Sequence, residues 1–198
     1  MGHKSVTVYC ASSSKVDAVY FAAANEAGTA IGQRGLTLVY GGSYVGLMRA
    51  VADSARAVGG KVVGITPQLM VDQKVHDTKC DELIVTPNMR ERKRLLEERG
   101  DAFLILPGGI GTLEELFEVL VGRALGYHGK PIALVNTNGC YDALLAMLAD
   151  GERRHLVKPS IARLLLVHPT AEEAVAALMA TPNKMLNPAD TVFEFEKK

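Results

Sequence analysis

The chain has 198 residues, of which 48% are hydrophobic and 22% are charged, a composition typical of a compact globular protein. Its 22 basic and 22 acidic residues give a formal net charge of zero, whereas nucleic-acid-binding domains usually carry a basic surplus. We therefore expect no nucleic-acid partner. The length fits one domain with its own hydrophobic core.

The compartment is inferred from the start of the chain and from the cysteines. The chain begins Met-Gly-His-Lys and continues into a β-branched segment, without a secretory signal or a transmembrane run. Cys10, Cys80 and Cys140 have no metal-ligand spacing, and their odd number does not suggest a disulfide framework. The sequence therefore predicts a cytoplasmic protein with reduced thiols, no metal site and no membrane association.

Apolar β-branched segments alternate with segments of helical periodicity along most of the chain. In chain order, the predicted elements are a strand at 5–10, a helix at 16–33, a strand at 36–40, a helix at 45–58, strands at 61–65 and 82–86, a helix at 88–99, a strand at 102–106, a helix at 113–125, a strand at 131–135, a helix at 141–148, a strand at 164–167 and a helix at 171–179. The predicted strands are apolar on both faces, which is typical of a parallel sheet covered by helices on both sides.

This alternation predicts the α/β class, as a Rossmann-like doubly wound parallel sheet with helices on both faces. Residues 1–180 are expected to form a single Rossmann-like nucleotide-binding catalytic domain, and 181–198 a loosely ordered C-terminal extension. Such sheets bind ligands at the carboxyl ends of their strands. The turns at 11–14, 41–46 and 108–112 should therefore converge on one rim.

The segment 107–115 reads Pro-Gly-Gly-Ile-Gly-Thr-Leu-Glu-Glu and follows a predicted strand directly. Its glycines let backbone N–H groups approach a ligand closely, and a helix N-terminus attracts anions. Thr112 and Glu115 also match a capping box, in which Thr112 is the N-cap and Glu115 bonds back to it. Glu114 points about 100° away around the helix, so the two acids cannot share one role. A capping role and a chemical role for Glu115 both stay open.

The segment 88–94 reads Asn-Met-Arg-Glu-Arg-Lys-Arg at the end of the fourth predicted strand. Asn88 and Glu91 match an N-cap signature. The cations that follow oppose the helix dipole, so either a bound anion or a solvated face paired with glutamates must explain them. Arg92 stands out because a guanidinium group can bind phosphate and ribose hydroxyls with two hydrogen bonds.

The turn at 41–46 reads Gly-Gly-Ser-Tyr-Val-Gly and matches neither of two common nucleotide motifs. The G-x-G-x-x-G order of dinucleotide-binding turns is absent, and Leu47-Met48 stands where a P-loop requires Lys and Ser or Thr. An ATPase and a hydride-transfer enzyme are therefore disfavoured. Gly41 and Gly42 serve either tight-turn geometry or ligand contact.

The M-x-x-R-K pattern at 89–93, together with P-G-G-x-G-T-x-x-E at 107–115, resembles the paired signature of the Lonely Guy (LOG) family. Members of this family are cytokinin riboside 5′-monophosphate phosphoribohydrolases, once widely mislabelled lysine decarboxylases. The resemblance extends from Val6 to about Met179 and includes the segments 10–13, 40–42, 45–48 and 158–159.

The resemblance implies hydrolysis of the N-glycosidic bond of AMP or N6-modified AMP, which releases an adenine-type base and ribose 5-phosphate without a cofactor. It implies that Arg92 and Glu115 are the catalytic pair. The substrate-binding residues that it implies are Ser12, Gly41, Gly42, Met89, Lys93, Gly108, Gly109, Ile110, Gly111, Thr112 and Glu114. It also implies a homodimer or a higher homo-oligomer in which one subunit helps to complete the site of another.

Two other functions are possible for a chain with this pattern of elements. A non-catalytic nucleotide- or cofactor-binding carrier could share this fold, but a carrier has no need of a carboxylate beside a phosphate. A pyridoxal-phosphate decarboxylase needs a Schiff-base lysine, and no lysine occurs in the segment 108–115.

The sequence departs from the LOG pattern at three places. Lys74 stands where a glutamate is often found, and Ser43 replaces a third glycine. Val121-Gly122-Arg123-Ala124 replaces the usual Thr-Trp-Ala-Gln. The loss of a Trp and a Thr near the base pocket is expected to alter which base substituent fits, so the preference between AMP and prenylated AMP stays open.

Overall fold

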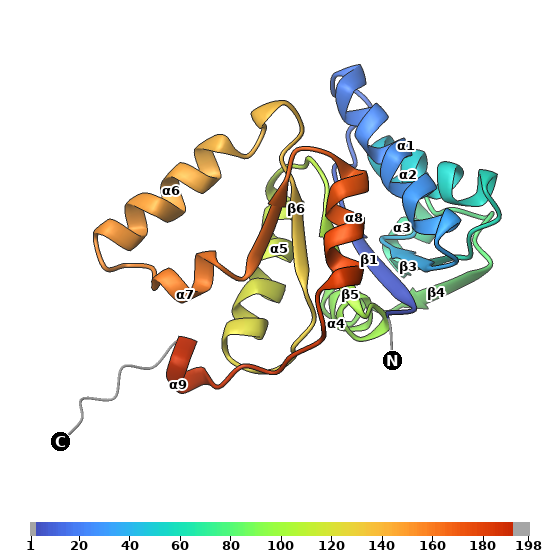
Figure 1. Cartoon of the computed structure of the whole chain (residues 1–198). Helices are drawn as coiled ribbons and strands as arrows, with labels where there is room; N and C mark the ends of the chain where they lie inside the picture. The colour runs from blue at the N-terminus through green and yellow to red at the C-terminus, as the bar shows by residue number, and fades with distance from the viewer. Residues whose placement is uncertain (1–2, 192–198) are drawn as a thin grey trace.

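The structure is a computed structural model, and it describes residues 3–191 of the chain. Within these residues a seven-stranded sheet has the order β4-β3-β2-β1-β5-β6-β7 (Figure 1). The strands are β1 (Ser5–Tyr9), β2 (Thr37–Tyr40), β3 (Val62–Pro67), β4 (Glu82–Thr86), β5 (Ala102–Ile105), β6 (Ile132–Val135) and β7 (Leu165–His168). The helices are α1 (Ala18–Gln33), α2 (Gly46–Ala57), α3 (Gln68–Asp72), α4 (Met89–Arg99), α5 (Ile110–Ala124), the short 3-10 helix η1 (Thr137–Gly139), α6 (Asp142–Arg153), α7 (Pro159–Ala162), α8 (Ala171–Ala180) and α9 (Pro188–Thr191).

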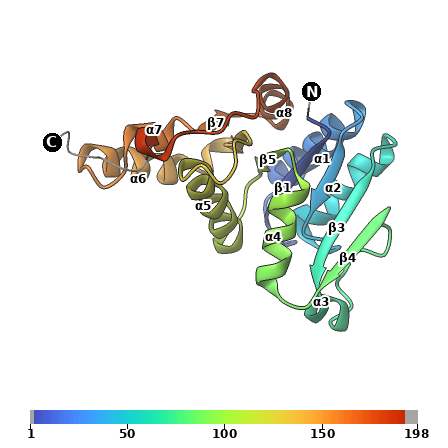
Figure 2. The same ribbon diagram turned by 90° about the horizontal axis from the view of Figure 1, so that it is seen from below.

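Every pair of neighbouring strands in this sheet is parallel. The chain builds the sheet outward from β1 to β4, then returns to add β5 on the other side of β1 and continues to β7 (Figure 2). The order therefore reverses between β1 and β5, and such a switch point leaves a crevice at the carboxyl ends of the two strands.

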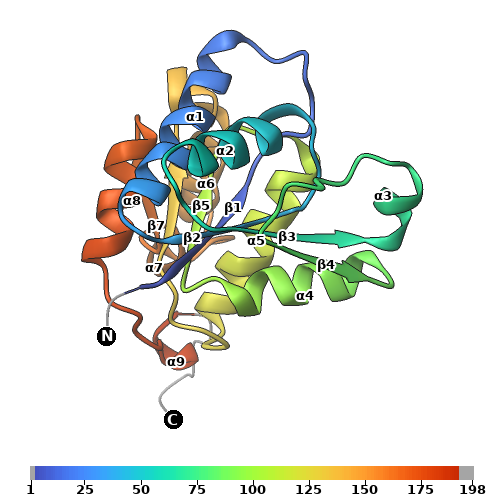
Figure 3. The ribbon, with the colours of Figure 1, turned by 90° about the vertical axis from the view of Figure 1, so that its right-hand side faces the viewer.

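Helices cover both faces of the sheet, as the alternating pattern predicted. Alternate residues of β1 point to opposite faces, so Val6 and Val8 join one apolar cluster and Tyr9 joins the other. The first cluster includes residues of α1, α2 and α8, and the second includes residues of α4, α5 and α6. Figure 3 shows α1 and α2 on one side of the sheet and α4 on the other. The Rossmann-like, doubly wound α/β fold is thus confirmed.

Most predicted elements lie within a few residues of the observed ones, and the larger differences have local causes. The helix predicted to end at Leu148 continues to Arg153, and Gly151 in its last turn packs so closely that a Cβ there would lie 2.8 Å from a Val157 methyl. Helix α3 was not predicted, since its five residues are too few to show a periodic pattern.

Residues 181–191 of the predicted C-terminal extension contact the domain, and 192–198 lie outside the described residues. The backbone N–H of Lys184 donates to the carbonyl of Gly129 at 3.0 Å, and the Thr191 hydroxyl donates to the carbonyl of Ala124. Leu186 packs against the apolar cluster beneath α5. The segment therefore contacts the C-terminal end of α5 and the loop that follows it.

The cysteines and helices bear on two other expectations. Cys10 is buried, Cys80 and Cys140 are partly buried, and all three are free thiols, as predicted. None of the helices within residues 3–191 combines the length and apolar character that crossing a bilayer requires.

Candidate active site

A cavity of about 320 Å³ opens at the carboxyl ends of β1, β2, β3 and β5. It is formed by the three turns that the sequence placed on one rim, together with residues of α2, α3, α4 and α5, so the predicted convergence is confirmed. The lining residues are Val8, Tyr9, Cys10, Ala11, Ser12, Ser13, Gly41, Ser43, Met48, Pro67, Met70, Met89, Arg92, Gly109, Ile110, Gly111, Thr112 and Glu115.

Hydrogen bonds join the turns after β1 and β2. The N–H of Leu47 donates to the carbonyl of Ala11 at 3.0 Å, and the N–H of Gly46 donates to the Ser14 hydroxyl at 3.3 Å. Gly46 has a φ of 49°, and a Cβ at this position would lie 2.5 Å from the Ser12 carbonyl carbon. A glycine is needed here because both the left-handed backbone and the close approach exclude a side chain.

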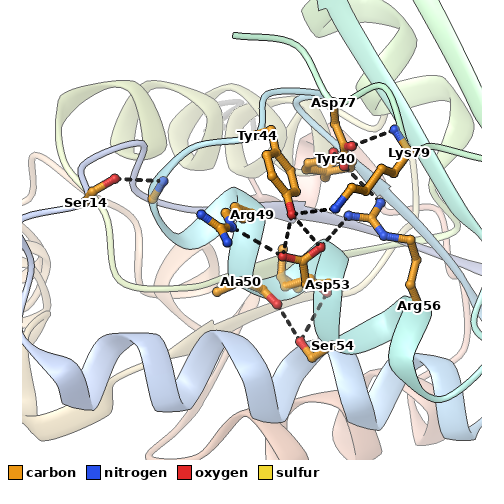
Figure 4. A network of polar contacts seen from close by, with 12 residues as sticks. Ser14, Tyr40, Tyr44, Arg49, Ala50, Asp53, Ser54, Arg56, Asp77 and Lys79 are labelled. Atoms are coloured by element: carbon orange, nitrogen blue, oxygen red, sulfur yellow. Dashed lines mark hydrogen bonds and ion pairs between the residues drawn. The ribbon is translucent and has the colours of Figure 1, made fainter.

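A buried polar network supports the turn after β2 from outside the cavity (Figure 4). The Asp77 carboxylate, only 1% exposed, accepts hydrogen bonds from the Tyr40 hydroxyl at 2.7 Å and from Arg56 Nη1 at 2.9 Å. The backbone N–H of Asp77 donates to the carbonyl of Gly42 at 2.8 Å. The buried charge is therefore paired, and the turn is fixed on the side facing away from the cavity.

Arg92 and Glu115 meet inside the cavity. Arg92 Nη1 donates to Glu115 Oε1 at 3.0 Å, and the two side chains are only 13% and 12% exposed. Arg92 Nε donates to the carbonyl of Ile65 at 3.2 Å. A Cβ on Gly41 would lie 2.1 Å from Arg92 Nη2, so the guanidinium group rests directly on the Gly41 backbone. The arginine is thus held by three different elements of the fold.

The surroundings of Glu115 change the pKa of its side-chain carboxyl. Burial raises the pKa of the carboxyl above its usual value, and the nearby Glu114 charge acts in the same direction. The charge and hydrogen bond of Arg92 oppose this and favour the ionised form. A buried carboxylate with a raised pKa can orient water and accept a proton from it.

The capping box predicted at 112–115 is absent. Helix α5 begins at Ile110 with Gly109 as its N-cap, and the N–H of Leu113 donates to the carbonyl of Gly109 at 3.0 Å. Gly108 permits this early start, because a Cβ there would lie 2.1 Å from Thr112 Oγ1. Glu115 is therefore one turn inside the helix, where it is free to reach Arg92.

The early start of α5 also changes the surface offered to a ligand. The N–H groups in the first turn of a helix have no acceptor within the helix. Ile110, Gly111 and Thr112 occupy that turn and line the cavity. The positive end of the helix dipole acts at the same place, which suits an anion such as a phosphate group.

The other cations of the 88–94 segment do not enter the cavity lining. Lys93 Nζ contacts Glu114 at 2.9 Å and Glu118 at 3.2 Å, both on α5. Arg94 is paired with two glutamates of its own helix. Pairing with glutamates, rather than a bound anion, therefore accounts for these two cations, and of the three consecutive basic residues only Arg92 faces the cavity.

The structure brings together most of the residues predicted for the site. Those that line the cavity are Ser12, Gly41, Met89, Arg92, Gly109, Ile110, Gly111, Thr112 and Glu115, and those that do not are Gly42, Lys93, Gly108 and Glu114. Gly42 serves turn geometry, with a φ of 66°, and Gly108 makes room for the Thr112 side chain.

An apolar wall of the cavity was not anticipated from the sequence. Met48, Pro67 and Met70 join Met89 there, and Tyr9, which also lines the cavity, stacks on Phe103. Met70 could not have been found because it lies on the unpredicted helix α3. The position of Tyr9 at the end of β1, directly before a turn assigned to the rim, was an available signal.

Of the departures from the LOG pattern, only Ser43 lines the cavity. Lys74 follows α3 with a φ of 57°. Val121 is 50% exposed, and Gly122 lies beside the ring of His128. The substitutions on α5 therefore lie away from the cavity that this chain forms by itself.

The residues present bear on two kinds of chemistry, one that needs a metal ion and one that needs a Schiff-base lysine. Among residues 3–191 no group of three or more His, Cys, Asp or Glu side chains is placed to hold a metal ion. The residues that line the cavity include no lysine that could carry a Schiff base.

Comparison with known sequences gives consistent relatives. A family model described as "Possible lysine decarboxylase" matches residues 48–178. The cytokinin riboside 5′-monophosphate phosphoribohydrolase of Mycobacterium tuberculosis is 44% identical over 89% of this chain and 94% of its own length. An Arabidopsis thaliana protein of the same name is 38% identical over 89% of this chain and 78% of its own length.

Solved structures give a more distant likeness. The molybdenum cofactor binding protein of Rippkaea orientalis superposes with a TM-score of 0.68, at 19% identity over 89% of this chain and 96% of its own. The molybdenum cofactor carrier protein of Chlamydomonas reinhardtii gives a TM-score of 0.66, at 22% identity over 89% and 98% of the two chains. At these identities the likeness extends to the fold alone.

Proposed function

Because the chain belongs to the LOG family of cytokinin riboside 5′-monophosphate phosphoribohydrolases, we propose that it cleaves the N-glycosidic bond of AMP or N6-modified AMP. The products are an adenine-type base, which is a cytokinin when the substrate is suitably modified, and ribose 5-phosphate. The observation that carries this assignment is the Arg92–Glu115 pair, 3.0 Å apart in a cavity beside the N-terminus of α5.

Substrate binding follows from the charges around the cavity. The 5′-phosphate lies against the first turn of α5, where Ile110, Gly111 and Thr112 present N–H groups without helical acceptors. Arg92 faces the same space and can add a charged hydrogen bond to the phosphate or to a ribose hydroxyl. The base then lies toward the wall that includes Met48 and Met70.

Glu115 acts on the reacting carbon. Cleavage of the bond between C1′ and the base nitrogen leaves positive charge on the ribosyl group, which a nearby carboxylate stabilises. Water adds to C1′, Glu115 accepts the proton that this water loses, and the departing base nitrogen takes up one proton from Glu115 or from solvent, which completes the hydrolysis. Arg92 keeps the carboxylate oriented and ionised between turnovers, since its charge opposes the effect of burial on the Glu115 pKa.

The two alternative functions receive less support. The carriers that share the fold are only 19% and 22% identical, whereas the named phosphoribohydrolases are 38% and 44% identical. A carrier also has no use for a buried carboxylate in its anion site. A pyridoxal-phosphate decarboxylase requires a lysine that is missing from the cavity lining.

Three finer points extend the proposal. The thioether side chains of the apolar wall are adaptable and suit an apolar N6 substituent as well as plain AMP. The protein is a homodimer or a larger homo-oligomer, as the resemblance to the family implies. It acts in the cytoplasm, which accords with its free cysteines.

One assay panel tests the activity and its chemistry. Purified protein is incubated with AMP, isopentenyl-AMP, other nucleoside monophosphates and the matching nucleosides, and release of free base is measured. We expect base release from the adenosine monophosphates and little from the nucleosides, because the latter lack the group bound by α5. Equal activity on nucleosides would contradict the phosphate site.

The role of Glu115 is tested in the same assay with Glu115→Gln, which keeps the size of the side chain but cannot accept a proton. We expect kcat to fall by about 100-fold or more. Base release by Glu115→Gln at the wild-type rate would exclude the carboxylate from the chemistry.

A further inference from the structure

Helix α5 carries three acids close together, and only one of them lies in the cavity lining. Glu114 and Glu118 are one turn apart and flank Glu115 on the same helix. Like charges at this spacing repel each other and weaken a helix. Two uncompensated neighbours would also disfavour ionisation of Glu115.

Lys93 lies where it compensates both flanking acids. Its Nζ contacts Glu114 Oε1 at 2.9 Å and Glu118 Oε2 at 3.2 Å. The lysine side chain is only 17% exposed, although the two glutamates are 59% and 45% exposed. The ammonium group is therefore held against α5 rather than extended into solvent or into the cavity.

The contacts of Lys93 form a second link beside the catalytic pair. Lys93 follows Arg92 on α4, and Glu114 precedes Glu115 on α5. The two helices are thus joined by adjacent ion pairs, Arg92 with Glu115 and Lys93 with Glu114. A change at Lys93 must act on the position of α5 and on the charges around Glu115.

We propose that Lys93 is a positioning residue, which ties α4 to Glu114 and Glu118 on α5 and thereby sets the place and the charge surroundings of Glu115. This inference rests on the proposed function only in calling Glu115 catalytic. It assigns to Lys93 a role different from the substrate contact that the sequence motif implied.

The groups that face Glu115 define what the experiment should measure. Arg92 and Lys93 on α4 lower the Glu115 pKa, while burial and Glu114 raise it. Tyr9 and Cys10, at the end of β1, are near enough for the Glu115 charge to raise their own pKa values. Removing Lys93 should therefore raise the Glu115 pKa, and removing the charge of Glu114 should lower it.

The test is a titration of the free protein by carboxyl ¹³C NMR, with the Glu115 signal identified by its loss in Glu115→Gln. We expect the midpoint to move up in Lys93→Met and down in Glu114→Gln, with Lys93→Arg close to wild type. A lysine that only stabilised the fold would leave the Glu115 midpoint in place, and Glu114→Gln is the control that shows this midpoint responds to the charges around Glu115. Because no turnover is needed, the result is independent of whether the protein hydrolyses AMP.

Two activity measurements complete the test. A higher Glu115 pKa leaves less of the ionised form at a given acidic pH, so the acid limb of the kcat–pH profile should move to higher pH in Lys93→Met and stay near the wild-type position in Lys93→Arg. The Kd for ribose 5-phosphate should stay within about twofold, whereas loss of a direct phosphate contact would weaken it by about tenfold or more.

An unchanged Glu115 midpoint in Lys93→Met would overturn the proposal, and so would a large loss of ribose 5-phosphate binding with that midpoint unchanged. If Lys93→Met does not fold, Lys93→Gln, which also removes the charge, is titrated in its place. Opposite shifts in a protein that releases no base would uphold the positioning role and reject the proposed function. Base release without any shift would do the reverse.

Discussion

At the scale of single residues, Arg92 depends on its neighbours for its position. It donates to the Ile65 carbonyl and to Glu115, and its outer nitrogen lies on the bare backbone of Gly41. A guanidinium group with several fixed partners loses little further freedom when it binds a ligand. Gly41 therefore contributes to the site by lacking a side chain, and not only by forming a turn.

Gly41→Ala tests this dependence. The new methyl group would lie 2.1 Å from Arg92 Nη2, so the guanidinium group must leave the position in which it pairs with Glu115. Because this displacement disturbs the Arg92 contacts with Glu115 and the Ile65 carbonyl, we expect the unfolding free energy to fall by about 1–3 kcal/mol and kcat by about tenfold or more. Steady-state kinetics and urea unfolding measure the two effects.

The control for Gly41→Ala is the same change in an Arg92→Ala background. If the methyl group acts only by displacing Arg92, it should cost no further activity there, because the side chain that it displaces is gone. Equal losses in the two backgrounds would show that Gly41 acts on the substrate directly. In that case the packing argument for Gly41 would be wrong.

At the scale of elements, α4 and α5 show why the same capping signature succeeded once and failed once. Asn88 caps α4 as predicted, since its side chain accepts from the N–H of Glu91 at 3.0 Å. In α5 the signature at 112–115 is present, but the helix begins earlier, at Ile110. Gly108 and Gly109, before Thr112, let the chain turn into the helix earlier than the signature predicts. Glu115 is then paired with Arg92 and not with the backbone of Thr112.

Asn88→Ala should weaken α4 at the end nearest the cavity. The change leaves the N–H of Glu91 without its side-chain acceptor, which typically costs about 1 kcal/mol. Chemical denaturation should show this loss, and Asn88→Asp, which keeps an acceptor oxygen, should show much less of it. Equal stability of Asn88→Ala and the wild type would mean that the cap contributes nothing measurable.

At the scale of the whole molecule, His128 links the end of α5 to the sheet. Its ring lies 5.3 Å from that of Phe103 on β5, its Nε2 bonds the Val119 carbonyl at 3.0 Å, and its Nδ1 accepts from the N–H of Lys130 at 3.2 Å. Burial lowers the pKa of His128 from 6.5 to about 4, and the charges of Lys130 and Arg123 act in the same direction. The folded protein therefore keeps this ring neutral.

This buried ring predicts a loss of stability in mild acid. Below pH 6.5 the unfolded chain binds a proton at His128, whereas the folded chain does not until the pH approaches 4. The contribution is fully present above pH 6.5 and decreases as the pH falls, with a limiting slope of about 1.4 kcal/mol per pH unit. Urea unfolding at several pH values between 7 and 4.5 measures it.

His128→Gln is the matched variant, because an amide can still donate to the Val119 carbonyl but does not titrate. Its stability should depend less on pH than that of the wild type across the same range. Parallel curves for the two proteins would assign the acid sensitivity to other groups. The comparison also removes the contributions that the two proteins share.

The sequence by itself determined the order of strands and helices along the chain, because the apolar periodicity that indicates each element is a local property and the inner strands are apolar on both faces. Through the resemblance of its two motifs to the LOG family it also predicted Arg92 and Glu115 as partners in the site, and the two side chains do lie 3.0 Å apart. It could not determine α3 or the entry into α5, where short length and glycine geometry outweigh the local pattern.

Only the tertiary structure decided how the charged residues divide their roles. Arg92 and Lys93 are adjacent in the sequence, yet one faces the cavity and the other is paired with Glu114 and Glu118 outside it. Successive residues on a helix point in different directions, so the partner of each depends on where α5 lies against α4. That placement arises from packing across the sheet, which no local sequence pattern records.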